Sequence, residues 1–175
     1  YSVSLHENIP SSIKVDAGEN IMELKYLDKK QVLKGRIRKI HSGNKIGIVA
    51  KINPQTTSTK NQRSAYGVEP GENYSGGGGD VEIHSFAYVT SVDGWPTSVS
   101  SYSMEAHPGN YTYFDWTKGS MVTRNVTIYN VLCYIIPGTK IIMWTADIHW
   151  NYNYYNGESF SAVTQYTASE YYIYG

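Results

Sequence analysis

The chain has a single cysteine, no long hydrophobic run and few charged residues. One thiol, Cys133, excludes an intrachain disulfide, and its place in the apolar run Val131–Ile136 predicts a core residue. No stretch approaches the roughly 18 consecutive apolar residues of a transmembrane helix. Charged side chains make up 17% of the sequence, against about 25% in an average soluble protein. The expected surface is therefore polar but largely uncharged.

Catalytic and metal-binding motifs are also missing. The five histidines are scattered without an HExxH or paired spacing, and there is no GxSxG sequence. The glycine run 76–79 lacks the Lys and Ser/Thr that follow in a phosphate-binding loop. Asp147 and His149 share one strand face, but an ordinary polar outer face explains them better than a metal or acid/base pair. We therefore expect no enzymatic activity, no catalytic residue, no metal and no cofactor.

The net charge is zero, but its distribution is uneven. Residues 1–63 hold twelve basic and five acidic residues, which gives +7, while residues 64–175 hold three basic and ten acidic residues, which gives −7. A basic first third fits contact with an anionic partner such as lipid headgroups or nucleic acid. It fits equally well with two strands whose solvent faces lie beside the acidic segment. Overall neutrality argues against nucleic acid, whose binding depends on phosphate neutralisation.

Tyrosine is abundant, and fifteen of the seventeen tyrosines follow residue 65. Many lie on segments that alternate apolar and polar side chains, most clearly over 142–154. Because successive side chains of a strand point to opposite faces, one parity of this segment should face the core and the other should face solvent. The predicted inward residues are Ile142, Trp144, Ala146 and Ile148, and the predicted outward residues are Thr145, Asp147 and His149.

The same period-two pattern predicts an all-β fold: one domain over residues 1–175, an antiparallel β-sandwich or jelly roll with little helix. The clearest strands are expected near 81–92, 98–106, 111–116, 121–135, 140–154 and 159–174. Before them we expect two short edge-like strands within 1–16 and a hairpin over 32–52 with a basic outer face. Residues 20–34 fit either a strand or an amphipathic helix. Residues 53–80, rich in Ser, Thr and Gly, predict a long mobile loop.

Two features bear on secretion. The chain begins at Tyr1 without an initiator Met, as in a processed secreted protein or a trimmed chain. It also contains three Asn-x-Ser/Thr sequons, at Asn73, Asn110 and Asn125, although such triplets arise often by chance in this composition. We expect a secreted protein.

Two turn-proximal segments concentrate aromatic side chains and are the candidate ligand site. Residues 107–116 carry four aromatic rings beside a turn, and residues 150–157 alternate Asn with Trp and Tyr before a second turn. Aromatic faces with neighbouring amides and hydroxyls suit sugar rings, a choline headgroup or the interfacial zone of a bilayer. The alternative is that alternate tyrosines fill the core. The rings expected to include the ligand contacts are Tyr111, Tyr113, Trp116, Trp150, Tyr152, Tyr154 and Tyr155.

Four stretches carry a family resemblance: Arg38-Lys39-Ile40, Phe86-Ala87-Tyr88, Ser103 to Trp116, and Tyr154-Tyr155-Asn156-Gly157. With them the chain resembles the actinoporins, single-domain β-sandwich cytolysins that recognise phosphocholine lipids. The resemblance implies a headgroup site lined by Ser103, Pro108, Tyr111, Tyr113, Trp116, Tyr154 and Tyr155.

Three functions stay open on the sequence alone. The first is a secreted, non-enzymatic protein that recognises a membrane lipid headgroup or another cell-surface component, with a pore-forming cytolysin as its strongest form. The second is a lectin-like module that uses the same rings to bind a glycan. The third is a structural or assembly jelly roll, a homo-oligomer with tyrosines in its subunit contacts.

Overall fold

The computed structural model describes residues 7–54 and 79–175, and all its regular elements are strands. The strands are β1 (Ser12–Asp16), β2 (Ile21–Lys25), β3 (Lys30–Lys34), β4 (Ile37–Ser42), β5 (Lys45–Ile52), β6 (Val81–Val92), β7 (Trp95–His107), β8 (Asn110–Asp115), β9 (Ser120–Ile135), β10 (Ile141–Tyr154) and β11 (Ser159–Tyr171). Within those two ranges the chain forms no helix of the length and hydropathy that a membrane span requires.

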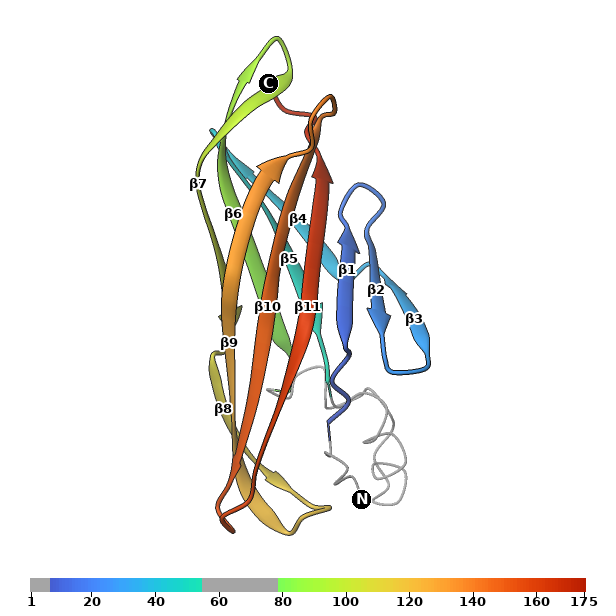
Figure 1. Ribbon diagram of the computed structural model, residues 1–175, viewed down its shortest axis with the longest axis vertical. Helices are drawn as coiled ribbons and strands as arrows, with labels where there is room; N and C mark the ends of the chain where they lie inside the picture. Colours follow the sequence, from blue (N-terminus) through green and yellow to red (C-terminus); the bar gives the residue numbers. More distant parts are fainter. Residues whose placement is uncertain (1–6, 55–78) are drawn as a thin grey trace.

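The strands form two sheets packed face to face (Figure 1). Sheet A has seven strands in the order β3-β2-β1-β11-β10-β9-β8, and sheet B has four in the order β4-β5-β6-β7. Neighbours pair antiparallel except β1 and β11, which are parallel. The prediction of an all-β antiparallel sandwich with little helix is confirmed. Sheet B is a simple meander, so the fold lacks the two Greek keys of a jelly roll.

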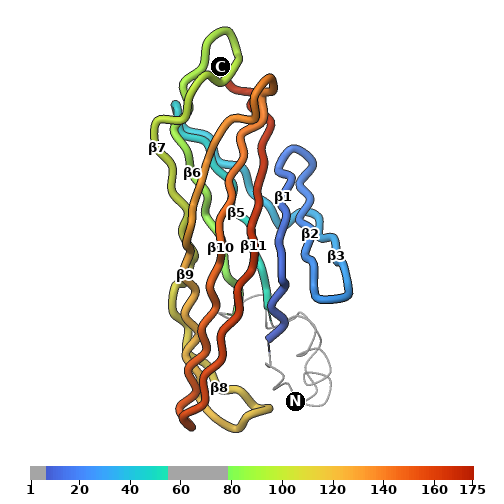
Figure 2. The backbone as a smooth tube through the Cα atoms, viewed as in Figure 1, coloured from blue at the N-terminus to red at the C-terminus, as the bar shows by residue number. Residues whose placement is uncertain are grey.

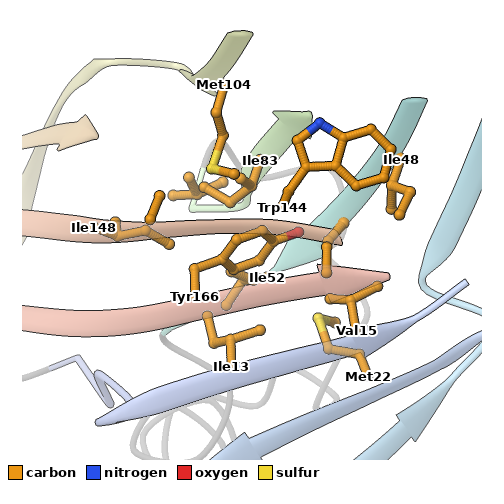
Figure 3. Packing of buried hydrophobic residues seen from close by; sticks show 14 of the residues in the cluster. Ile13, Val15, Met22, Ile48, Ile52, Ile83, Met104, Trp144, Ile148 and Tyr166 are labelled. Atoms are coloured by element: carbon orange, nitrogen blue, oxygen red, sulfur yellow. The ribbon is translucent and has the colours of Figure 1, made fainter. Parts of the chain in front are cut away.

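The core lies between the sheets and is built on the inward parity of β10. Ile142, Trp144 and Ile148 are fully buried, and Ala146 is nearly so. On the other parity, Thr145, Asp147 and His149 are partly exposed. Figure 3 shows Trp144, Ile148 and Tyr166 of sheet A packed against Ile48, Ile83 and Met104 of sheet B. The predicted facing of this strand is confirmed.

A β-bulge changes which residues of β9 face the core. The register with β10 shifts between Thr145 and Asp147, and Asn130 opposite this point has φ 57°. The Asn130 amide donates to Asp147 Oδ2 at 2.8 Å and holds the bulge on the outer face. Before the bulge the even-numbered Val122 and Val126 are buried, and after it the odd-numbered Cys133 is buried. One extra residue reverses the parity of everything that follows.

The amino-terminal third differs in detail from the sequence prediction. Residues 20–34 form strands β2 and β3, so the strand alternative holds and the helix does not. The predicted hairpin 32–52 is narrower, because β4 and β5 pair over 37–52 while Leu33 belongs to β3. Of the predicted loop over 53–80, residues 55–78 lie outside the described ranges.

Sheet A is longer than sheet B at one end. Strands β9, β10 and β11 have 16, 14 and 13 residues and continue below the lower ends of β5 and β6 (Figure 1). Residues 7–10 lie against the inner face there: Thr164 Oγ1 donates to the Pro10 carbonyl at 2.6 Å, and Glu7 pairs with Arg124. The segment replaces sheet B as the cover of this part of the core.

A candidate ligand-binding tip

Two turns meet at the free end of sheet A (Figure 2). One joins β8 to β9 over residues 116–119, and the other joins β10 to β11 over 155–158. The Tyr155 N–H donates to the Met121 carbonyl at 2.9 Å, which ties the second turn to the first. Lys118 Nζ also lies 3.5 Å from Glu158 Oε2. The two turns therefore form one structural unit.

Asp115 organises the first turn from a fully buried position. Its Oδ1 accepts the backbone N–H groups of Thr117 at 2.9 Å and Lys118 at 3.1 Å. Its Oδ2 accepts the Tyr154 hydroxyl at 2.6 Å, so the same carboxylate also anchors β10. Burial first, and then this hydrogen bond to Asp115, raises the pKa of Tyr154. The carboxylate fixes the turn that presents Trp116.

The second turn is held by its own side chain. Asn156 Oδ1 accepts the Glu158 N–H at 2.9 Å, an Asx-type contact that closes the turn locally. Gly157 has φ 98°, a conformation that a residue with a Cβ rarely adopts. Its N–H donates to the Tyr154 carbonyl at 3.0 Å. Tyr155 is left projecting from a defined backbone.

Three exposed rings at this end form what we call the aromatic tip: Phe114 near the end of β8, Trp116 in the first turn and Tyr155 in the second. Their exposed fractions are 39%, 67% and 70%. Phe114 and Trp116 meet edge to face, with centroids 4.6 Å apart and planes at 68°. Such a pair offers a preformed apolar surface, and Trp and Tyr side chains each combine an apolar ring with a polar atom. The tip can therefore contact a partner that is apolar on one side and wet on the other.

Three predicted ligand contacts are instead core residues, which corrects the sequence interpretation. Trp150, Tyr152 and Tyr154 are 0%, 1% and 5% exposed, because they continue the inward parity of β10. Their polar atoms are satisfied inside: the Trp150 indole donates to Thr164 Oγ1 at 2.9 Å, and the Tyr152 hydroxyl donates to Glu7. None offers a ring face to a surface ligand.

Tyr111 and Tyr113 lie beside a buried ion pair. Both lie on the inward parity of β8, and their rings stack with centroids 5.5 Å apart. The Tyr111 ring lies 5.2 Å from the guanidinium carbon of Arg124, which pairs with Glu7 at 2.7 Å. Burial, and then the charge of Glu7, raise the pKa of Tyr113. Both rings are half-buried and brace the cover of the core.

Ser103 and Pro108 do not join the tip. Ser103 is exposed on the outer face of sheet B, opposite Phe86. Pro108 is exposed in the link between β7 and β8, after a cis peptide bond. Of the nine residues expected from the sequence, Trp116 and Tyr155 are the two with strongly exposed rings, and they lie on the two linked turns. Sequence reasoning missed Phe114 and the organising Asp115, although an Asp four residues before Gly119 is a turn signal.

The described residues contain no group of three or more His, Cys, Asp or Glu side chains arranged to hold a metal ion. The chain matches no family model, no curated protein and no solved structure. The resemblance to actinoporins therefore stays a prediction.

Proposed function

We propose that this protein is a secreted, non-enzymatic binding protein that attaches to the interfacial zone of a membrane through the aromatic tip. The observation that carries the proposal is a group of three exposed rings: Trp116 and Tyr155 lie on turns that hydrogen bonds hold in place, and Phe114 lies at the end of β8. Trp and Tyr are favoured at the membrane–water interface, where the ring is buried and its polar atom stays hydrated. Because the turns are already ordered, insertion of the tip costs little conformational entropy.

The test compares the tip with a matched aromatic residue at the opposite end of the molecule. The variants are Trp116→Ala, Tyr155→Ala and their combination, and the control is Trp95→Ala at the β6–β7 turn (Figure 1). Trp95 is 50% exposed, and Lys140 Nζ lies 4.9 Å from its ring. Binding to phosphatidylcholine vesicles is measured by co-sedimentation, and folding is checked by thermal melts.

Burying one large aromatic side chain is worth about 1.5–3 kcal/mol. We expect the double tip variant to bind vesicles at least about tenfold more weakly, with the melting temperature little changed. Trp95→Ala should bind like the unmodified protein. Equal losses for the tip and Trp95 variants, or none for the tip variants, would contradict the proposal.

A lectin-like function is the second candidate, because the outer face of sheet A beside the tip carries rows of uncharged polar side chains. One row across four strands is Asn110, Asn125, Asn151 and Ser161, and the next is Thr112, Thr123, Asn153 and Ser159. Amides and hydroxyls at strand spacing suit the hydroxyls of a neutral glycan. If the protein is a lectin, Asn151→Ala combined with Asn153→Ala should weaken its binding to a glycan and leave its binding to vesicles unchanged. Glycan binding without vesicle binding would favour this second function.

A further inference from the structure

The turn between β2 and β3 combines an exposed apolar apex with lysines. Leu27 is 95% exposed, the most exposed large hydrophobic side chain among the described residues. The Tyr26 N–H donates to the Lys29 carbonyl at 2.8 Å, which closes a two-residue turn with Leu27 and Asp28 at its apex. The hairpin is also held next to its turn, where the Ser11 N–H and hydroxyl both donate to the Lys25 carbonyl, at 2.7 and 2.8 Å. Leu27 is thus held out from the surface by an ordered hairpin.

A pocket of about 520 Å³ lies against this turn on the outer face of sheet A. Its charged lining consists of four lysines, Lys14, Lys25, Lys29 and Lys30, against two acids, Glu23 and Asp28. A second hollow of about 360 Å³ shares Leu27, Lys29 and Lys30 with it. Leu27 therefore stands between two basic concavities.

Four lysines share a single acidic strand residue here: Glu23 lies opposite Lys14 across the β1–β2 pair and forms an ion pair with Lys30. Lys25 and Lys30 are direct cross-strand partners, an arrangement of like charges that destabilises a sheet. Within residues 7–54 and 79–175, Lys30 is the one lysine of the four with a carboxylate within ion-pair distance, Glu23 at 3.2 Å. Among the described residues, no ion pair is formed by Lys14, Lys25 or Lys29. Lysines on the edge strand β3 discourage sheet pairing, but Lys14 and Lys25 lie on interior strands. This excess of positive charge is balanced if an anion occupies the pocket.

We propose that the pocket beside the β2–β3 turn binds the anionic headgroup of a membrane lipid, with Leu27 inserted at the acyl boundary. An apolar apex flanked by lysines is the chemistry of an interfacial membrane contact. The β2–β3 turn and the aromatic tip also point toward the same end of the molecule (Figure 1). The inference rests on the proposed membrane binding and adds to it a lipid charge class: the tip inserts into any interface, and the pocket selects anionic lipid.

The experiment compares co-sedimentation with vesicles of phosphatidylcholine alone and vesicles that also contain phosphatidylserine. The variants are Lys25→Gln with Lys29→Gln, and Leu27→Ser. The matched control is Lys34→Gln with Arg38→Gln, which also removes two positive charges, but from exposed positions outside the pocket. Inorganic phosphate and soluble glycerophosphoserine are added as competitors, and melts confirm folding.

The unmodified protein should bind better when phosphatidylserine is present. A lysine near an anionic surface contributes about fivefold, so the pocket variant should lose about 30-fold on those vesicles and little on phosphatidylcholine. The control variant should lose much less affinity for the phosphatidylserine vesicles. Leu27→Ser should weaken binding to both vesicle types.

Three results would overturn the inference: no preference for phosphatidylserine, equal losses in pocket and control variants, or full competition by inorganic phosphate. The last would indicate a free phosphate site. A phosphatidylserine preference that survives Trp116→Ala with Tyr155→Ala, while those changes leave phosphatidylcholine binding intact, would uphold the pocket and count against the tip.

Discussion

The buried pair of Glu7 and Arg124 gives the sharpest test of how this fold is closed. Arg124 is 0% exposed and Glu7 4%, with Nη1 and Oε1 2.7 Å apart. Arg124 also donates to the Gly79 carbonyl at 3.3 Å, while its Nε and Nη2 are buried and have no hydrogen-bond partner among the described residues. Glu7→Gln would leave a buried guanidinium without a counter-charge. Because Arg124 is fully buried, solvent water cannot stabilise that positive charge.

The expected loss follows from that burial. Removing one partner of a buried ion pair costs about 3–5 kcal/mol, far more than an exposed pair contributes. For a chain of this length, each kcal/mol shifts the melting temperature by about 2–4 °C. Glu7→Gln should therefore melt about 6–20 °C lower. Replacing both residues, Glu7→Leu with Arg124→Met, removes both buried charges and should recover most of the loss.

Urea unfolding followed by tryptophan fluorescence measures the free energies. A double-mutant cycle made of Glu7→Leu, Arg124→Met and both together isolates the coupling between the two residues. The control is Glu23→Gln, which breaks the exposed pair with Lys30 and should cost less than about 1 kcal/mol. A loss below about 1 kcal/mol for Glu7→Gln would refute the reasoning. So would a double variant that loses the sum of the two single changes.

Two further predictions concern the sandwich itself. Gly47→Ala should lower the free energy of unfolding by about 1–3 kcal/mol, because its Cβ would come 2.5 Å from Phe86 Cδ1 and 2.6 Å from the Ser85 carbonyl. The control in the same urea assay is Gly109→Ala, whose Cβ would have no contact below 4.0 Å and which should lower the free energy of unfolding less. Burial raises the pKa of the Cys133 thiol to about 12, so between about pH 9 and 12 the unfolded chain loses this proton while the folded chain keeps it, and stability should fall as pH rises. Urea unfolding across this range should show a steeper fall than in Cys133→Ala, and an identical slope in both proteins would contradict it.

The strands themselves could be predicted from the sequence, because alternation is a local property of a chain that buries one face. Strand β6 is observed at the predicted bounds, 81–92, and β10 and β9 begin within one residue of the predicted positions. The two turns of the aromatic tip were also predictable, since Gly119 and Gly157 mark the places where the backbone needs φ above zero.

Side-chain accessibility could not be predicted in the same way. Alternation separates two faces but does not say how far along a strand the partner sheet or another segment covers the inner one. Trp150, Tyr152 and Tyr154 look like a ligand surface by composition, but all three are buried. Residues 7–10 meet Tyr152 and the Trp150 partner Thr164 where sheet B does not reach, and Tyr154 packs against Phe160 and bonds to Asp115. The Asn130 bulge likewise reversed the parity of β9 through one residue.

The sequence by itself determined the strands, their turns and the inward face of β10, since each depends on residues adjacent along the chain. The tertiary structure alone decided which aromatic rings are exposed and which charges meet. Glu7 and Arg124 are 117 positions apart, and the lysine pocket forms from three short strands that pair beside β11. Such contacts depend on how the sheets are assembled, and no local pattern encodes the distance between segments that only folding brings together.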